Sequence, residues 1–303
     1  MRWRGFGVVA AAVLVAGLLA GHPLIPDLPG NPGSVVETFL PWLGLSVPVF
    51  AALGWWRRPR LALPAVLLPL IAWLVLFAPA LLPDDERHDL IAVQHNASDE
   101  NRDPAGTVRE LLRVSPDLVA LSEVLPEALP AYDAAFGAAY PHRVVHGTVA
   151  LWSRHPVVEE AALDIRPQAF GPDWNRGLRA VIRTPLGEVA VYVTHLPSVR
   201  MGVRGFATAP RDESAARLGA ALRAERLDRV LLLGDLNGTV DDRGLRPVTA
   251  RLTTAPAFAF SWPARSPVAR IDQILGRGLT VTSLWSLPRT GSDHLPIAAR
   301  VRF

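Results

Sequence analysis

The polar side chains best suited to chemistry follow short apolar runs in the second part of the chain. Asn96, Glu123 and His195 each come after an apolar run of four to six residues. Asp235 and Asn237 lie in the sequence GDLN, directly after the run VLLL. Short apolar runs bounded by turn signals are typical of buried strands, and loops after such strands can hold side chains in a shared cleft. We therefore expect these groups to gather at one site.

Two further segments carry candidate groups. Asp272 lies in RIDQIL, and Asp293 and His294 lie in GSDHLP. Carboxylate and amide oxygens without any cysteine point to a hard divalent cation, Mg²⁺ or Mn²⁺. Because Mg²⁺ usually takes one or two protein carboxylates and waters, Glu123 with help from Asn96 and Asp293 would be sufficient.

Each segment also has a purely structural interpretation. The pair Asn237-Gly238 is a good hairpin turn, and His195 could be a buried structural histidine. The sequence SDH could cap a helix, and Asp272 could be an edge charge. The set as a whole favours a functional site, because all the elements occur in one domain and each lies near a strand end.

The elements that must position these groups are a mixture of strands and helices. Strands are predicted at 90–93, 117–121, 189–194 and 230–233, and leucine and alanine recur at helical spacing in 107–114 and 212–227. Strands interleaved with helices predict a layered α+β domain. We assign it to residues 84–303, which contain no run long enough to span a membrane.

Residues 1–83 are expected to form a membrane anchor with three transmembrane helices. Apolar runs occupy residues 5–21, 35–56 and 61–82, and a spanning helix needs about 20 mostly apolar residues. A cleaved signal peptide is the alternative for the first run, since it is short and has a basic start.

Arginine placement predicts the topology of these helices. Arg2 and Arg4 precede the first run, and Arg57, Arg58 and Arg60 lie between the second and third runs. The link between the first two runs has no basic residue. By the positive-inside rule, the protein is a multi-pass protein of the plasma membrane, with a cytoplasmic N-terminus and an extracellular catalytic domain.

Composition excludes some classes of site. The chain of 303 residues has no cysteine, which rules out disulfides and thiolate metal sites. All 31 basic residues are arginine, yet the formal net charge is only +3. High arginine usage reflects codon bias more readily than nucleic-acid binding, so nucleic acid is not an expected partner.

The whole set of motifs resembles the endonuclease/exonuclease/phosphatase superfamily, which includes DNase I-like nucleases, sphingomyelinases and inositol polyphosphate phosphatases. The resemblance covers residues 90–303, with Ser122 and Leu236 where the family commonly has Gln and Phe. It implies a four-layer α/β sandwich and metal-dependent hydrolysis of a phosphoester. The segments that carry it are Asn96, PDLVALSE, GTVALWSRHPV, THL, GDLN, RIDQIL and SDHLP.

The resemblance also implies a role for each residue. Glu123 would be the main metal ligand, with Asn96 nearby and Asp293 in support. His294, oriented by Asp272, would be the general base or would stabilise the transition state. Asp235 and Asn237 would act on both the nucleophile and the phosphate. His195 would contact the phosphate or serve as a general acid.

Three spans joined to this domain, with SVVETFLPWLGL in the second, resemble the actinobacterial teicoplanin-resistance membrane proteins. That resemblance implies hydrolysis of undecaprenyl pyrophosphate at the outer membrane face, with a lipid-linked diphosphate and the membrane as partners. The alternatives are a surface-tethered nuclease or phosphodiesterase of the same superfamily, and a non-catalytic membrane-anchored binding domain.

Overall fold

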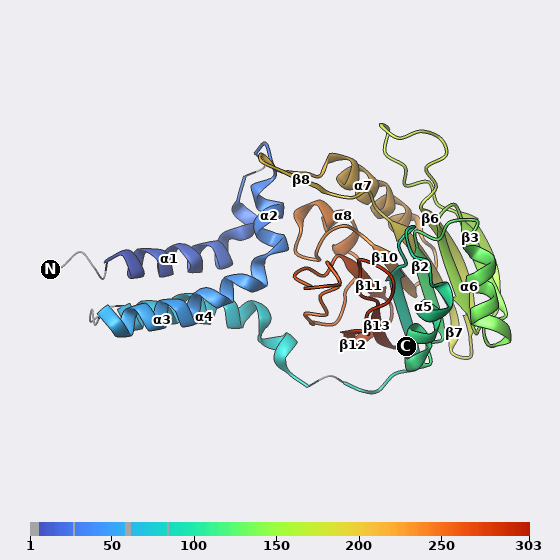
Figure 1. Ribbon diagram of the computed structural model, residues 1–303, viewed down its shortest axis with the longest axis horizontal. Helices are drawn as coiled ribbons and strands as arrows, with labels where there is room; N and C mark the ends of the chain where they lie inside the picture. The colour runs from blue at the N-terminus through green and yellow to red at the C-terminus, as the bar shows by residue number, and fades with distance from the viewer. Residues whose placement is uncertain (1–5, 27, 58–61, 84) are drawn as a thin grey trace. The chain divides into compact units, whose positions relative to one another are not determined.

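A computed structural model describes residues 6–26, 28–57, 62–83 and 85–303 (Figure 1). The chain divides into two compact units, which we name after the sequence predictions: the anchor unit, residues 1–83 with 201–206, and the catalytic unit, residues 84–200 with 207–303. The sequence prediction placed 201–206 in the catalytic domain, whereas these residues pack with the anchor. The topology arginines Arg2, Arg4, Arg58 and Arg60 lie outside the described residues.

The anchor unit is helical. Two helices in the described part of the chain are long and apolar enough to cross a membrane, Phe6–Leu24 and Leu63–Leu81. A third candidate is a bent pair, Pro32–Thr38 and Leu40–Trp56, with an angle of 68° at the break. The helical elements of the anchor unit are α1 (Phe6–Gly21), η1 (His22–Leu24), α2 (Pro32–Thr38), η2 (Leu40–Leu45), α3 (Ser46–Arg57), α4 (Ala62–Phe77) and η3 (Ala78–Leu81).

Close contacts hold these helices together. The indole N–H of Trp73 in α4 donates to the carbonyl of Pro41, 2.7 Å away. A Cβ on Gly44 would lie only 2.5 Å from the Trp73 ring, so only glycine permits this approach. Glu37 is buried, with its carboxylate 3.5 Å from His22 Nδ1. A buried ionisable pair of this kind is costly in an apolar segment unless both groups have partners.

The catalytic unit is a mixed α/β sandwich of two sheets. One sheet, here sheet A, has the order β12-β13-β1-β2-β4-β3, and the other, sheet B, has the order β11-β10-β7-β6-β5. Each contains one parallel pair, β1 with β2 and β7 with β10. The strands are β1 (Leu90–Asn96), β2 (Leu118–Ser122), β3 (His142–His146), β4 (Val149–Ser153), β5 (Val157–Ala162), β6 (Gly177–Thr184), β7 (Gly187–His195), β10 (Val230–Asp235), β11 (Asp272–Arg277), β12 (Thr280–Ser286) and β13 (Ile297–Arg302).

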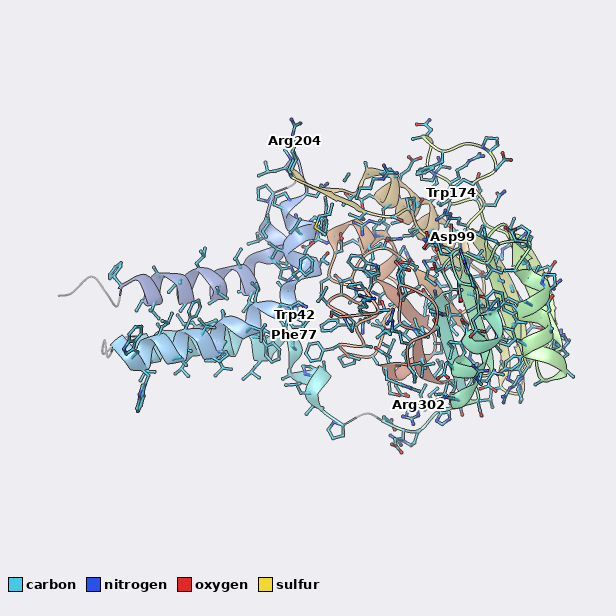
Figure 2. All side chains as sticks on the ribbon, in the orientation of Figure 1. Trp42, Phe77, Asp99, Trp174, Arg204 and Arg302 are labelled. Carbon is cyan, nitrogen blue, oxygen red and sulfur yellow. The ribbon has the colours of Figure 1, made fainter. Side chains whose placement is uncertain are left out.

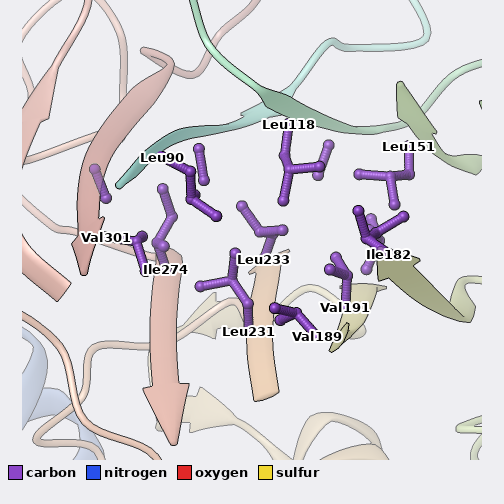
Figure 3. Close-up of a cluster of buried hydrophobic side chains, with 14 of the residues drawn as sticks. Leu90, Leu118, Leu151, Ile182, Val189, Val191, Leu231, Leu233, Ile274 and Val301 are labelled. Carbon is purple, nitrogen blue, oxygen red and sulfur yellow. The ribbon is translucent and has the colours of Figure 1, made fainter. Parts of the chain in front are cut away.

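Helices cover the outer faces of both sheets. Helices α5 (Pro104–Leu111) and α6 (Leu129–Phe136) share an apolar cluster with sheet A, and α7 (Ala209–Ala224) and α8 (Arg246–Thr249) share one with sheet B. A third cluster lies between the sheets, where alternate side chains of both sheets point toward one another (Figure 3). The layers therefore run helices, sheet, sheet, helices. Short 3₁₀ turns complete the unit: η4 (Leu112–Val114), η5 (Gly137–Ala139) and η6 (Arg243–Leu245).

The strands are longer than their apolar runs predicted. β1, β7 and β10 continue through Asn96, His195 and Asp235, so these residues end the strands rather than begin the loops. Polarity marked them as loop residues in the sequence, but the ladder hydrogen bonds continue past the last apolar side chain. Helix α7 begins at Ala209, three residues before the predicted start.

Candidate functional site

Three polar side chains of sheet B lie in one row. His195 pairs with Asp235 across β7 and β10, and Asp235 pairs with Asp272 across β10 and β11. Paired residues on neighbouring strands point to the same face of a sheet. The alternate positions just before the row, such as Val193 and Leu233, belong to the cluster between the sheets. The row is therefore the polar end of the inner face of sheet B.

Sheet A has a similar polar end. Asn96 pairs with Ser122 across β1 and β2, and the alternate positions before them, Gln94 and Ala120, are fully buried. Glu123 follows Ser122 directly with a φ of +58°. A non-glycine residue in this left-handed region costs roughly 1 kcal/mol, and such residues occur often at functional sites. The backbone turn at Glu123 ends the strand.

The loop before β13 brings His294 to the same place. The Ser292 hydroxyl donates to the carbonyl of Asn96 at 2.7 Å and accepts from the His294 N–H at 3.0 Å. His294 Nδ1 then lies 2.7 Å from Asp272 Oδ2. This short bond to a buried carboxylate fixes the ring and leaves Nε2 facing the other groups.

The predicted residues converge on the carboxylate of Asp235. Its Oδ2 lies 3.1 Å from the Asn96 amide nitrogen, 3.6 Å from His195 Nε2 and 3.8 Å from His294 Nε2. Glu123 Oε1 lies 3.8 Å from the same His195 nitrogen. Groups up to 198 positions apart in the sequence, from Asn96 to His294, thus meet within a few ångströms.

Asn237 lies at the edge of this group. Its backbone N–H donates to Asp235 Oδ1 at 2.9 Å, and its side-chain amide donates to the Leu196 carbonyl at 2.9 Å. Its φ is +48°, another left-handed non-glycine conformation. These bonds join the ends of β7 and β10 and fix the orientation of the Asp235 carboxylate.

Asp293 differs from the other predicted ligands. Its side chain is exposed, and its backbone carbonyl accepts from Ala264 at 2.7 Å. Its charge contributes to the raised pKa of His294. The structure therefore brings together seven of the eight predicted residues by direct contact, and relates Asp293 to them through its charge and its position beside His294.

Sequence reasoning missed two arginines. Arg176, just before β6, lies with Nη1 3.1 Å from His195 Nδ1 and stacks on Trp174 at 5.4 Å. The same Nη1 lies 3.4 Å from His195 Nε2. Because a guanidinium can only donate, we assign the nearer Nδ1 as the acceptor and Nε2 as the protonated nitrogen. An arginine at the start of a strand has no signal that separates it from an exposed charge.

Arg211 is the second missed residue. It lies in the first turn of α7 and is fully buried. Its guanidinium donates to Asp242 at 2.9 Å and to the carbonyl of Asn237 at 3.1 Å. The arginine therefore supports the GDLN loop from behind. The sequence prediction began the helix at Asp212 and left Arg211 before it, whereas Arg211 lies within α7 and reaches Asn237 and Asp242 in a distant segment.

Burial and charge shift the pKa values of the site. Burial, and then the charge of Asp272, raise the pKa of Asp235 to about 7. Burial opposes the protonation of His294, but the charges of Asp272 and Asp235 outweigh it and raise the pKa of that histidine. Burial also acts against the charged form of Asp272, yet the adjacent His294 lowers the pKa of that carboxyl.

His195 behaves in the opposite way. Burial, followed by the charge of Arg176, lowers the pKa of His195 to about 3. The imidazole is therefore neutral near pH 7 and can donate through Nε2 toward Asp235 and Glu123. A neutral donor of this kind suits hydrogen bonding to a phosphate oxygen better than it suits acid catalysis.

The donor set fits a hard cation. One oxygen or nitrogen from each of Asp235, Asp272 and His294 lies within 4.8 Å of the others. Asp272 and His294 already bond each other, which leaves Glu123, Asn96 and Asp235 as the freer oxygen donors. Burial, and then the charge of Asp272, raise the pKa of Asp235, so a cation bound beside this carboxylate would favour its ionised form. Carboxylate and amide oxygens in this setting suit Mg²⁺ or Mn²⁺.

The chain is similar to known proteins over most of residues 84–303. A sequence model of the Endonuclease/Exonuclease/phosphatase family matches residues 91–294, while a search of curated proteins gave no match.

Solved structures share the fold. Mannosyl-6-phosphatase from Bacteroides thetaiotaomicron has a TM-score of 0.60 at 16% identity, over 71% of this chain and 100% of that one. Sphingomyelinase C from Streptomyces griseocarneus has a TM-score of 0.53 at 20% identity, over 72% of this chain and 99% of that one. A double mutant of beta toxin from Staphylococcus aureus with bound magnesium ions has a TM-score of 0.53 at 18% identity, over 70% of this chain and 99% of that one.

Proposed function

Because the chain belongs to the Endonuclease/Exonuclease/phosphatase family, we propose that it is a membrane-anchored phosphohydrolase that depends on a divalent cation. The observation that carries this proposal is the convergence of Asn96, His195 and His294 on the buried carboxylate of Asp235. Hydrolysis of a phosphoester needs an oriented water, a group to take its proton and donors for the phosphate oxygens. The converging groups can supply all three.

Glu123 and Asn96 would hold the Mg²⁺ or Mn²⁺ ion, with Asp235 beside them and Asp293 in support. A divalent cation at such a site neutralises phosphate charge and lowers the pKa of a bound water. Glu123 is the most accessible of these buried or half-buried carboxylates, with a side chain 25% exposed against 1% for Asp235. A cation and a substrate could therefore reach it from solvent.

The side chains of sheet B would carry the proton transfers. Asp235, with a pKa raised toward neutrality, would accept a proton from the attacking water, and Asn237 would hold that carboxylate in place. His294, protonated and oriented by Asp272, would donate hydrogen bonds to phosphate oxygens as their charge grows. The alternative role for His294, as the general base, requires its neutral form.

His195 and Arg176 would complete the binding of phosphate. The neutral imidazole of His195 would donate one hydrogen bond through Nε2. Arg176 supplies a planar cation, a group that forms paired hydrogen bonds with phosphate oxygens. Two adjacent donors would suit a diphosphate, which presents more oxygens than a single phosphate does.

For the substrate we propose undecaprenyl pyrophosphate, hydrolysed to the monophosphate and inorganic phosphate at the outer face of the membrane. Three spans with a cytoplasmic N-terminus would put the catalytic unit on that side. Anchoring in the same bilayer raises the effective concentration of a lipid that cannot leave it. Such a reaction would contribute to teicoplanin resistance, as the resemblance of residues 34–45 to those membrane proteins implies.

The test is phosphate release by the full-length protein in detergent. Undecaprenyl pyrophosphate, a soluble phosphomonoester and plasmid DNA would be compared with and without EDTA. We expect release from the lipid, loss of release with EDTA, and a loss of several orders of magnitude in His294→Ala. Nicking of plasmid without phosphate release would instead identify a tethered nuclease, and inactivity on all three substrates would favour a binding domain.

A further inference from the structure

A short hairpin belongs to the anchor unit although the chain on both sides of it belongs to the catalytic unit. Strands β8 (Arg200–Gly202) and β9 (Gly205–Ala207) form a separate two-stranded sheet. Residues 201–206 pack with the anchor unit, although residues on both sides belong to the catalytic unit. Only four residues, 196–199, separate His195 from this hairpin.

The hairpin is fixed to the link that follows α1. The Phe206 N–H donates to the Gly30 carbonyl at 2.8 Å, and the Asn31 amide donates back to the Phe206 carbonyl at 2.8 Å. Gly30 has a φ of +88°, and a Cβ there would lie 1.6 Å from the Arg204 carbonyl oxygen. A backbone approach this close is possible only for glycine. The attachment is therefore specific to these positions and not a chance proximity.

The other side of the hairpin is exposed and has a mixed character. Met201 is 65% exposed and Val203 is fully exposed. Arg200 and Arg204 are also exposed, and Figure 2 shows Arg204 extending away from the ribbon. Apolar side chains at a tip flanked by arginines are unfavourable in water but suit the boundary between lipid chains and headgroups.

The link that holds the hairpin is exposed in the same manner. Leu24 is 85% exposed and Leu28 is 52% exposed. Leu28 lies next to the attachment, because its carbonyl accepts the Asn31 N–H at 2.9 Å. Leu24 ends the first candidate membrane span, so the link begins at the depth where a bilayer ends. A segment fixed to this link lies near the headgroups as well.

We propose that the hairpin of β8 and β9, residues 200–207, is an interfacial element that inserts Met201 and Val203 among the lipids of the bilayer holding the anchor, with Arg200 and Arg204 on lipid phosphate groups. Arginine forms bidentate bonds with phosphate, and basic residues near an anionic surface strengthen membrane binding. This rests on the membrane anchoring in the proposed function but not on the hydrolysis. The contact would fix the height of the loop that follows His195.

The absence of cysteine from the chain permits a direct test. The single-cysteine variant Val203→Cys, labelled with the environment-sensitive dye NBD, would be reconstituted in nanodiscs containing anionic lipid. Leu186→Cys is the matched control, because Leu186 is a half-exposed apolar residue in the turn between β6 and β7. We expect a blue-shifted emission at position 203 that nitroxide-labelled lipids quench, and neither effect at position 186.

Two results would overturn the proposal. Equal emission and quenching at the two positions would show that the hairpin stays in water. A blue shift at 203 without quenching by nitroxide lipids would show that another protein surface, such as a second copy of the chain, covers it. Neither result depends on activity, so the reaction and the hairpin contact can fail separately.

A second measurement relates the contact to turnover. In Arg200→Gln/Arg204→Gln we expect phosphate release from a lipid diphosphate in anionic nanodiscs to fall by about tenfold, and release from a soluble phosphoester to be unchanged. Arg183→Gln, a change at an exposed arginine of β6, is the control and should alter neither. Equal losses on both substrates would mean that the hairpin arginines affect the catalytic unit itself and would contradict the proposal.

Discussion

The two sheets of the catalytic unit have the same plan but carry different chemistry. Each contains a parallel pair whose strands end in polar residues, Asn96 and Ser122 in sheet A, and His195 and Asp235 in sheet B. In sheet B these residues follow inner-facing apolar positions, such as Val193 and Leu233, whereas in sheet A the buried polar residue Gln94 already precedes Asn96. The same arrangement of strands thus gives each sheet a polar end on its inner face, and these two polar ends face one another.

The difference lies in exposure and charge. Glu123, at the edge of sheet A, is 25% exposed, whereas Asp235 and Asp272 of sheet B are 1% and 0% exposed. Burial of two carboxylates side by side shifts their proton affinities, and His294 lies between them. We therefore expect the strand ends of sheet A to control cation binding and those of sheet B to control proton transfer. Variants of Glu123 and Asp235 can separate the two roles.

The largest expected effect is on sheet B. Asp235→Asn removes the group that would accept the proton of the attacking water, so kcat should fall by about 10³-fold. The concentration of Mg²⁺ needed for half-maximal activity should change little, because Glu123 remains. Phosphate release measured over a Mg²⁺ titration checks both points. Recovery of Asp235→Asn activity at high Mg²⁺ would mean that Asp235 mainly binds the cation, and the division between the sheets would fail.

The corresponding change in sheet A is Glu123→Gln. It retains the shape of the side chain but removes its charge, so the Mg²⁺ requirement should rise at least about tenfold. Activity should return in part at high Mg²⁺, unlike that of Asp235→Asn. The same titration, together with calorimetric Mg²⁺ binding, tests this. An unchanged Mg²⁺ requirement would contradict the assignment of Glu123 as a ligand.

A third test concerns the pH profile. The proposed roles require Asp235 deprotonated and His294 protonated, so activity should rise with pH up to about 7, or lower with a bound cation, and fall at alkaline pH. Asp272→Asn removes a charge that raises both pKa values, so both limbs should move to lower pH. His95 also faces this group and stays neutral, because burial lowers its pKa to about 3.

Asp293→Asn is the control for the pH profile, since it removes an exposed charge beside His294 and should shift the profile less. A profile of Asp272→Asn identical to that of the unchanged protein would show that Asp272 does not control the protonation of His294. If only the alkaline limb moved, the group that sets the acidic limb would not be Asp235.

The smallest expected effect is on the free energy of unfolding and concerns Glu225, which bonds two strands of sheet B away from the polar strand ends. Glu225 accepts from Arg179 of β6 at 2.6 Å and from the Tyr192 hydroxyl of β7 at 2.9 Å. Glu225→Gln should lower the free energy of unfolding by about 2 kcal/mol, or roughly 5 °C in Tm. Glu188→Gln, in the exposed pair with Arg183, should cost about 0.5 kcal/mol or less.

The effect of Glu225 should depend on pH. Burial opposes its ionisation, but the bonds from Arg179 and Tyr192 outweigh it and lower the pKa to about 2. Its contribution is therefore present above its ordinary pKa of 4.5 and is lost as pH falls toward 2. Thermal unfolding in detergent at pH 7 and pH 3 checks this. A constant difference between Glu225→Gln and the unchanged protein at both values would exclude an ionic role.

Much of the fold could be predicted because its signals are local. The apolar runs located β1, β2, β7 and β10, and helical spacing located α5 and α7 to within a few residues. The exact ends of the strands could not be predicted, because a polar residue at an inner-facing position has the same composition as a loop residue. Residues 201–206 also gave no local signal of their attachment to Gly30 and Asn31.

The sequence by itself determined which side chains are available at the strand ends and that they favour oxygen-ligated metal chemistry, since these depend on residue type and on neighbours in the chain. Only the tertiary structure decided that Asp235 is the meeting point, that His195 is neutral beside Arg176, and that Arg211 supports Asn237. Proton affinity and orientation depend on burial and on charges from distant segments, and those come together only when the two sheets pack.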